Sequence, residues 1–570
     1  MQLELDLIFP PEVDLGYGFY MTAGDSAQFD AVVRDMSTGR TVSQTVVWTS
    51  SNTQVAEVDQ TGLVVALGAG FTDIEASIPQ ATYGFPLDVL EPVARIELTP
   101  AGPEVLRGGE MVLSAVAKGA SGKPLSGFYG PIVLPMSWSS SDSSVAIVDT
   151  AGAWPDDPGQ AATNVSAVQL GSATITASLD GVSGSTEVTV AVVRFEAVTA
   201  GGEHSCALTA DGTAYCWGSN SSYQSGDSVT VRYGQEHMPR RVATAARFVS
   251  LSAGAFHTCG VTTDGSVYCW GNNAQGQVGQ GPGMIPVTPS KVEVAGLKFG
   301  SISAGEGHTC AIGIDNKAYC WGSNGLGQLG STVSGICTLP GYKGSGGTEI
   351  PCSHVPVPVS GDLEFASVSA GRGHTCGITL QDLAYCWGDN ISGQLGDGST
   401  SDSSTAPVRV AGVPALASIS ASRFHTCAVA LDGTGYCWGA NNYGELGYGT
   451  LDESRVPLVV SGGHAWLSMH APAGGSYGHT CGVTDQNVAF CWGSNSWGQS
   501  GIADVLYLQV PTTVAGGTQF RLLSTGAEHT CGISIEGLAY CWGRSDDGRL
   551  GIAPAQVDGP VLVMGQPDLP

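Results

Sequence analysis

Apolar and polar residues alternate in short runs along most of this chain, and the runs end at Gly, Asp, Asn or Ser. One stretch contains four such runs: "RFVSLSAG" (247–254), "HTCGVT" (257–262), "SVYCWG" (266–271) and "PSKVEV" (289–294). Alternation with a period of two is typical of half-buried strands, and the Pro of the fourth run is tolerated on an edge strand. The pattern therefore predicts an all-β protein of short strands joined by tight turns.

This four-strand pattern returns about every fifty residues in the second part of the chain. Its marker is the His of an "H-[ST]-C" triplet, at His204, His257, His308, His374, His425, His479 and His529. A period near fifty with four strands per unit is typical of a β-propeller, and seven units would close into a ring without a free sheet edge. The pattern predicts a seven-bladed propeller over residues 194–570.

A different repeat fills the N-terminal part. The string "VWTSSNTQVAEVDQTG" (47–62) matches "SWSSSDSSVAIVDTAG" (137–152), which places Trp48 and Trp138 at equivalent positions. Units of about ninety residues with alternating strands are typical of small β-sandwiches. The sequence predicts two immunoglobulin-like domains, over 1–92 and 93–193, with an insertion in the second near 153–164.

Both repeats resemble known families. The motif "A-G-x-x-H-T-C-[AG]-[IV]…Y-C-W-G-x-N-x-x-G-Q-L-G" is similar to the regulator of chromosome condensation repeat, whose family folds as a seven-bladed propeller. Its "GQLG" part is clear at 327–330 and 393–396 and weakest at 223–226. The string "W-x-S-S-[ND]-x-x-V-A-x-V-D-x-x-G" resembles bacterial immunoglobulin-like domains of group 2. That resemblance implies stalks or adhesive modules of extracellular proteins.

Each propeller unit carries two Cys ten positions apart, separated by a turn such as "TADGT". A three-residue hairpin loop needs Gly, Asn or Asp at its third position, because that residue has a positive φ. The seven residues there are Gly212, Gly265, Asn316, Asp382, Gly433, Asn487 and Gly537. This turn sets Cys206 directly opposite Cys216, at the separation of a cross-strand disulfide.

The sixteen cysteines are therefore predicted to form eight disulfides. The pairs are Cys206–Cys216, Cys259–Cys269, Cys310–Cys320, Cys337–Cys352, Cys376–Cys386, Cys427–Cys437, Cys481–Cys491 and Cys531–Cys541. Two alternatives stay open, namely free buried thiols and zinc sites in which the His joins each Cys pair. A redox role is disfavoured because the chain contains no C-x-x-C motif. We expect no metal, no cofactor and no catalytic set.

Charge and compartment narrow the function. The formal net charge is −28, and the chain has no basic run, so nucleic-acid binding is not expected. No apolar run is long enough to cross a membrane, and no leader peptide precedes the first repeat. Sixteen cysteines that can pair favour an oxidising compartment. We therefore expect an extracellular or cell-surface protein whose leader is absent from this sequence.

Repeated His and Trp residues are expected to hold blades together, so a binding site is sought where the repeats differ. The residue before the Gly of each "N-x-x-G" loop varies, and it is aromatic or apolar at Tyr443, Trp497 and Leu326. Exposed aromatics on neighbouring loops are suited to protein or glycan contact. The loop between Cys337 and Cys352, with Tyr342, is a second candidate.

These observations predict a monomeric, exported, non-enzymatic binding or adhesion protein that presents a propeller on immunoglobulin-like spacers. Alternatives are a guanine-nucleotide exchange factor, which the founding member of the propeller family implies, and a secreted enzyme inhibitor of the propeller type. A light sensor like the plant ultraviolet-B photoreceptor is disfavoured, because no Trp stands two residues before any of the seven His. A propeller hydrolase is also disfavoured, because no catalytic set is found in this sequence.

Overall fold

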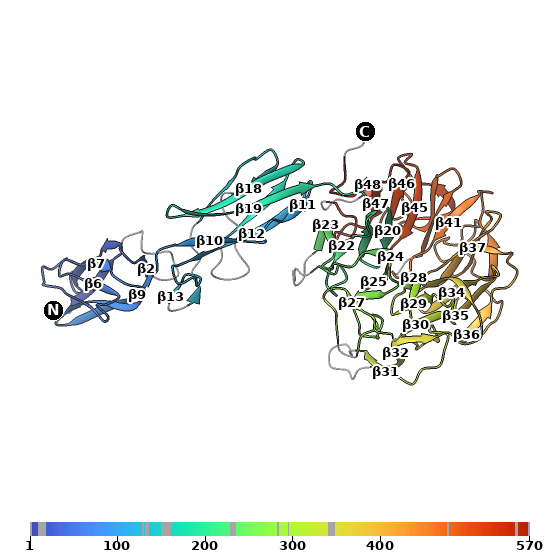
Figure 1. The fold of residues 1–570 in the computed structure, drawn as a ribbon, viewed down its shortest axis with the longest axis horizontal. Coiled ribbons are helices and arrows are strands. Elements are labelled where there is room, and N and C mark those ends of the chain that lie inside the picture. Colours follow the sequence, from blue (N-terminus) through green and yellow to red (C-terminus); the bar gives the residue numbers. More distant parts are fainter. Residues whose placement is uncertain are drawn as a thin grey trace. The chain divides into compact units, whose positions relative to one another are not determined.

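The computed structural model describes residues 3–9, 19–127, 130–131, 136–149, 161–227, 235–281, 284–294, 296–339, 348–475, 478–552 and 557–567. The chain forms two compact units, Met1–Ala191 and Val192–Pro570. The described residues form strands, turns and bends (Figure 1), and they contain no helix long and apolar enough to cross a membrane. The prediction of an all-β protein is confirmed.

The first part of the N-terminal unit is a sandwich around Trp48. One sheet has the strand order β2 (Phe19–Thr22), β9 (Ala81–Leu90), β8 (Gly70–Ile78), β5 (Val47–Ser50). A second has the order β3 (Ser26–Gln28), β7 (Leu63–Ala66), β6 (Ala56–Val58), and β1 (Leu3–Ile8) pairs with β4 (Asp30–Asp35). Strand β8 reads alternately exposed and buried, and Trp48 packs in one cluster with Phe85 and Val64. Period-two alternation therefore builds this core, as the sequence predicts.

A second hydrophobic core follows around Trp138. One sheet runs β11 (Glu104–Leu106), β19 (Val182–Ala191), β18 (Gly171–Leu179), β15 (Ser137–Ser140). The other runs β10 (Arg95–Thr99), β12 (Glu110–Lys118), β17 (Ala161–Ala167), β16 (Ala146–Val148), and β13 (Ser126–Gly127) pairs with β14 (Gly130–Pro131). Trp138 faces Ala177, as Trp48 faces Ala76 in the first sandwich. The predicted insertion lies outside the described residues up to position 160, and its last residues begin β17.

The C-terminal unit is built from seven sheets that follow one another along the chain, here called blades one to seven. In order they are β20 (Ala197–Ala200), β21 (His204–Leu208), β22 (Ala214–Ser219), β23 (Gln235–Arg241); β24 (Phe248–Ala253), β25 (His257–Thr262), β26 (Val267–Gly271), β27 (Ser290–Lys291); β28 (Phe299–Ala304), β29 (His308–Gly313), β30 (Ala318–Ser323), β32 (Thr348–Pro358), β31 (Ile336–Leu339); β33 (Phe365–Ala370), β34 (His374–Thr379), β35 (Ala384–Asp389), β36 (Ser403–Arg409); β37 (Leu416–Ala421), β38 (His425–Ala430), β39 (Gly435–Gly439), β40 (Ser454–Val459); β41 (Trp466–His470), β42 (His479–Thr484), β43 (Ala489–Ser494), β44 (Tyr507–Thr513); β45 (Phe520–Thr525), β46 (His529–Ser534), β47 (Ala539–Gly543), β48 (Val557–Leu562).

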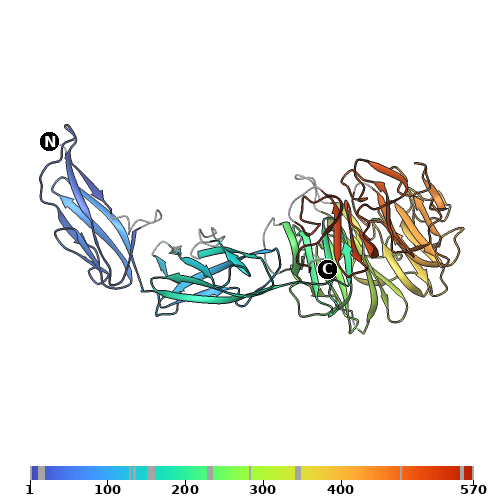
Figure 2. The same cartoon turned by 90° about the horizontal axis from the view of Figure 1, so that it is seen from above.

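The ring closes between blade seven and blade one, which lie beside each other in Figures 1 and 2. The backbone N–H of Ala200 donates to the hydroxyl of Ser524 at 2.9 Å, and Val193 donates to the carbonyl of Gly565 at 2.8 Å. Strand β20 contacts both β45 and β46. Each blade is built from strands that are consecutive in the sequence, so no blade combines strands from the two ends of the propeller. The ring is instead closed by side-chain and loop contacts between blades seven and one.

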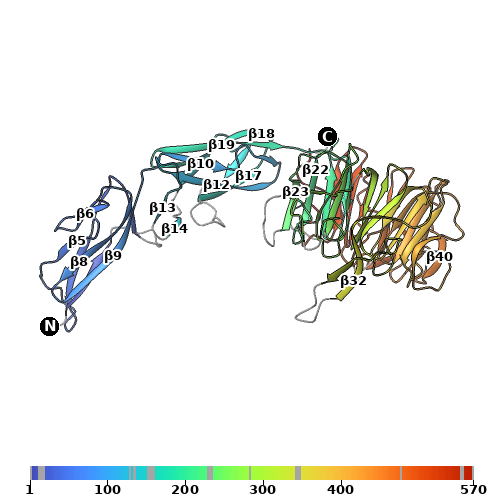
Figure 3. The same cartoon turned by 60° about the horizontal axis from the view of Figure 1, so that its bottom comes forward.

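Two details differ from the prediction. The edge strand expected over 289–294 is only Ser290–Lys291 long, with its register to β26 limited to two pairs. Blade three instead gains a fifth strand, because β31 and β32 extend its edge as a hairpin. Figure 3 shows this hairpin projecting from the blade.

Topology gives the propeller two unlike faces. The loop before each His and the loop after each Trp-Gly emerge together, and we call this side the loop face. The tight hairpin turns between the second and third strands emerge on the opposite side, which we call the turn face. The variable residue before the Gly of each "N-x-x-G" loop belongs to the loop face, so a binding site is sought there.

Candidate binding face of the propeller

Each blade is tied to the next through its histidine. The Nε2 atom of His204 lies 2.7 Å from the hydroxyl oxygen of Thr258, and that hydroxyl donates to the carbonyl of Gln224 at 2.9 Å. The other six His–hydroxyl pairs are His257–Thr309, His308–Thr375, His374–Thr426, His425–Thr480, His479–Thr530 and His529–Ser205, at 2.8 to 3.1 Å. Each of these hydroxyls also donates to a backbone carbonyl of the preceding blade.

This geometry fixes the role of the imidazoles. Because each hydroxyl has one proton and donates it to a carbonyl, the Nε2 atom must carry the hydrogen of the His–hydroxyl bond. Burial lowers the pKa of six of these imidazoles to about 3, and it lowers the pKa of His529 well below its usual value. The rings are therefore neutral at pH 7. The prediction that the repeated His makes an inter-blade hydrogen bond is confirmed, and the same bonds keep Nε2 from ligating a metal.

The repeated Trp residues also bridge blades. The indole N–H donates to the same carbonyl of the preceding blade from Trp217, Trp270, Trp387, Trp438 and Trp492, at 2.9 to 3.0 Å. All seven Trp side chains of the "CWG" strings are fully buried. The His and hydroxyl therefore form a structural unit that repeats at all seven junctions, and the Trp joins it by a hydrogen bond at five of them.

The structure contains eight disulfides, which join the eight cysteine pairs named in the sequence analysis. In seven hairpins the two cysteines are directly opposite, with Cα atoms 4.0 to 4.1 Å apart, after a turn whose third residue has a φ between +59° and +85°. The eighth joins Cys337 to Cys352 across β31 and β32. Here the Nε2 atom of His354 lies 3.6 Å from the Cys337 sulfur. With the sulfurs bonded to each other, this group has no thiolate to offer a metal.

The predicted rim residues occupy unlike environments. The Trp497 ring is 38% exposed, but the Arg544 guanidinium lies 4.4 Å above it and pairs with Glu528 at 2.7 Å. Leu326 is 36% exposed in blade three, and Tyr443 is partly buried beside a pocket in blade five. Tyr342 lies outside the described residues. The binding rim formed by these residues therefore stays a prediction.

A different cluster on the loop face combines aromatic and cationic side chains. Arg372 and Arg423, each two residues before a His, both lie over the ring of Phe424, with guanidinium carbons 5.4 and 4.9 Å from its centroid. Arg372 pairs with Glu306 at 3.3 Å. Sequence reasoning missed this cluster, although two adjacent repeats carry Arg at the same position. Arginine and aromatic side chains are the types enriched in energetically dominant interface positions.

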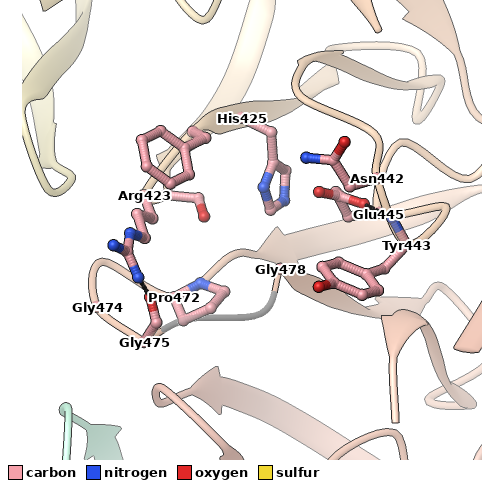
Figure 4. A pocket seen from close by; sticks show the side chains of 11 residues that line it. Arg423, His425, Asn442, Tyr443, Glu445, Pro472, Gly474, Gly475 and Gly478 are labelled. Carbon is pink, nitrogen blue, oxygen red and sulfur yellow. Dashed lines mark hydrogen bonds between the residues drawn. The ribbon is translucent and has the colours of Figure 1, made fainter. Parts of the chain in front are cut away.

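A pocket of about 140 Å³ lies next to this cluster, between blades five and six. Figure 4 shows Arg423 on one side of the pocket and Tyr443 with Glu445 on the other, and Phe424 also lines the pocket. An Nη atom of Arg423 donates to the carbonyl of Gly475, and Glu445 accepts the backbone N–H of Tyr443 at 2.7 Å. The pocket therefore has a cationic side and a carboxyl side.

Three departures from the repeat converge on this pocket. Ser422 stands where the other blades have Gly, apart from blade six, and Glu445 stands where five blades have Gln. Blade six has seven residues between Ala471 and His479, four more than the equivalent loop of blade two. The Ser422 hydroxyl is fully buried without a hydrogen-bond partner among the described residues, and burial raises the pKa of Glu445. The pocket is thus made by residues particular to this junction.

Comparison with known families matches these repeats. The profile of the "Regulator of chromosome condensation (RCC1) repeat" matches residues 195–224, 248–277, 301–328, 365–394, 417–445 and 520–549, and a second profile of that repeat matches 211–261, 264–312, 315–378, 381–429 and 432–475. The profile "Bacterial Ig-like domain (group 2)" matches residues 21–80.

Several known proteins are similar to the propeller part. The ultraviolet-B receptor UVR8 of Arabidopsis thaliana is 27% identical over 329 residues, covering 56% of this chain and 70% of the receptor. The human E3 ubiquitin-protein ligase HERC2 is 25% identical over 335 residues, covering 58% of this chain and only 7% of that protein. Solved structures of yeast Prp20p (TM-score 0.52, 20% identity, 62% of this chain and 87% of that one) and human WBSCR16 (0.53, 20%, 62% and 94%) share the propeller fold.

Proposed function

Because this chain belongs to the family of proteins built from regulator of chromosome condensation repeats, we propose that it is a non-enzymatic protein-interaction protein whose propeller binds a partner through its loop face. Yeast Prp20p, a fold relative, is described as binding Gsp1p and histones, and in a second structure it is bound to Kap60. A protein of this fold therefore binds other proteins, and we propose the same activity for this chain.

The observation that carries the proposal is the cluster of Arg372, Arg423 and Phe424. Two guanidinium groups flank one aromatic ring on a face where the repeated residues are otherwise occupied in joining blades. Such a cluster combines apolar area with fixed donors, which is the composition of an interface hot spot. The turn face lacks this support, because its Asp side chains are held in local turns, as Asp211 is by Thr209 and Thr213.

We further propose that the protein is exported and that the N-terminal unit acts as a spacer, with domains over 1–92, 93–193 and 194–570. Eight disulfides without a free cysteine among the described residues support an oxidising compartment. The group 2 bacterial immunoglobulin-like match supports the spacer role. Adhesion to another cell or surface is the use that this arrangement favours, and a glycan ligand is the alternative to a protein.

The binding face is tested by crosslinking from both faces. A photoreactive amino acid replaces Leu326 on the loop face or Lys298 on the turn face, and the full chain is exposed to whole cells and extract of its source. We expect loop-face crosslinks to one protein that Phe424→Ala and Arg372→Gln remove, while Lys298→Gln leaves them unchanged. Crosslinks that come equally from the turn face, or that survive both loop-face variants, would refute the proposal.

The compartment is tested by alkylating the thiols of the protein after it has been unfolded without reduction, because its cysteine side chains are buried in the folded state. An exported protein should retain nearly all of its sixteen cysteines as disulfides, so mass spectrometry should find almost no alkylated cysteine. Extensive alkylation after unfolding without reduction would place the chain in a reducing compartment and remove the proposal of export.

A further inference from the structure

We propose that the pocket between blades five and six binds the carboxylate of an acidic side chain that the partner protein inserts next to Arg423. This inference rests on the proposed function, because it names the chemical group by which the partner would be recognised on the loop face. The pocket, its unpartnered donors, its size and its charge each support it.

Arg423 has a charge that the described residues do not neutralise. No carboxylate of the described residues lies within 4 Å of its guanidinium, whereas the neighbouring Arg372 has Glu306. Burial and repulsion from Arg372 lower the pKa of Arg423, while Glu306 acts in the opposite direction. An arginine remains charged in proteins, so this site holds a cation that an incoming anion would stabilise.

Two hydrogen-bond donors at the pocket lack partners. The Nε–H of Arg423 and the hydroxyl of Ser422 are buried and make no hydrogen bond with the described residues. Ser422 is fully buried, and both residues line the pocket. An unsatisfied buried donor costs about 1–3 kcal/mol, and a carboxylate has two oxygens that could accept from both groups. Five of the other blades avoid this cost, because they have Gly at the position of Ser422.

The size of the pocket limits the ligand. Its volume of about 140 Å³ corresponds to a few water molecules, since each occupies about 30 Å³ in the liquid. Sites for whole small-molecule ligands have volumes of about 300–1,000 Å³. A pocket of this size therefore fits one inserted side chain better than a free cofactor or nucleotide.

The charge of the pocket selects a weakly charged anion. Glu445 lines the side opposite Arg423, and burial raises the pKa of this carboxyl. Asp389 is also buried near Arg372 and has a raised pKa. These carboxyls repel a phosphate dianion more than a single carboxylate, and the whole chain carries a net charge of −28.

The test uses the full chain and two capped pentapeptides, Ala-Ala-Glu-Ala-Ala and its Gln isostere, in saturation-transfer NMR at about 0.15 M salt, where long-range repulsion is screened. We expect the Glu peptide to bind about tenfold more tightly than the Gln peptide, the range for one hydrogen bond to a charged group. Arg423→Gln should remove the difference, and Ser422→Gly should reduce it. Glu445→Gln should preserve the binding of the Glu peptide.

The matched control is Arg247→Gln on the turn face, which removes the same charge from an arginine paired with Asp211. Equal binding of the two peptides, an equal effect of Arg247→Gln and Arg423→Gln, or tighter binding of inorganic phosphate than of the Glu peptide would each overturn the proposal. If the peptide experiments give any of these results while the loop-face crosslinks persist and depend on Phe424, the carboxylate pocket is wrong and the proposed binding face stands. If the crosslinks fail as well, the proposed function falls too.

Discussion

Replacing Thr375 with Val should destabilise the propeller strongly, because it removes one hydroxyl from the ring of inter-blade bonds. Thr375 is fully buried, accepts from His308 Nε2 at 2.8 Å and donates to the carbonyl of Gln328 at 2.8 Å. Valine has nearly the same shape, so no cavity forms. The substitution isolates the hydrogen bonds of one junction.

The magnitude follows from which groups lose their partners. The Gln328 carbonyl keeps a second donor, the indole N–H of Trp387 at 3.0 Å. The His308 Nε2–H keeps none, and its Nδ1 is already buried without a partner. One lost hydrogen bond of about 1 kcal/mol and one stranded donor at about 1–3 kcal/mol give a loss of about 2–4 kcal/mol. Thr375→Ser keeps the hydroxyl, as Ser205 does in blade one, and should cost only about 1 kcal/mol for the methyl group.

Guanidinium unfolding followed by tryptophan fluorescence measures both variants, since seven fully buried Trp residues belong to the propeller. Nitrogen-15 shifts of labelled histidine report the tautomer, and we expect the Nε2–H form at all seven positions. Equal stability of the Val and Ser variants, or an Nδ1–H tautomer for His308, would refute the reasoning.

Three further predictions concern the same ring. Burial holds six His pKa values at about 3, against about 6.5 in the unfolded chain, so their stabilisation of the fold is fully present above pH 6.5. The free energy of unfolding should fall by up to about 1.4 kcal/mol per pH unit per histidine as the pH drops toward 3. A free energy of unfolding that does not change over this pH range would contradict the burial of the imidazoles. Gly388→Ala should destabilise by at least about 2 kcal/mol more than Gly361→Ala in the same unfolding assay, because an added Cβ would lie 2.4 Å from the Gly373 carbonyl at a φ of +100°, whereas Gly361 has open space at +89°. Replacing Cys259 and Cys269 by Ala should lower the unfolding free energy by roughly 2–3 kcal/mol, whereas the same change at Cys337 and Cys352, in the added hairpin, should leave the midpoint of the ring unchanged.

The hairpins were predictable because their information is local. The residue with positive φ in each turn is Gly, Asn or Asp, and this one choice sets the strand register that brings the cysteines together. The shortened edge strand Ser290–Lys291 was less predictable, because Pro286 and Pro289 interrupt the stretch that should pair with β26.

The binding face needed spatial information. Tyr443 and Trp497 stand at equivalent repeat positions, yet Arg544 from the next blade covers the Trp497 ring. That contact joins side chains from different blades, and no periodicity within one strand encodes it. The cluster of Arg372, Arg423 and Phe424 left a signal in the sequence, since Arg occurs twice at the position two before the His. Its meaning required the placement of blades four and five side by side.

The reason to assign function to this junction is that Ser422 places a buried hydroxyl without a partner among the described residues where five other blades have Gly. The seven His–hydroxyl bridges do not use Ser422, whose hydroxyl lacks a partner among the described residues, or the side chain of Glu445, whose carboxyl is buried. Gly stands in place of Ser422 in five blades and would avoid the unpartnered hydroxyl, and the uncharged side chain of Gln would avoid the burial of a carboxyl. Ser422→Gly and Glu445→Gln should therefore raise the stability of the free protein while weakening its discrimination between acidic and neutral peptides. A double variant that is no more stable would mean that these residues are compensated within the fold, and the argument from unsatisfied groups to a ligand would then fail.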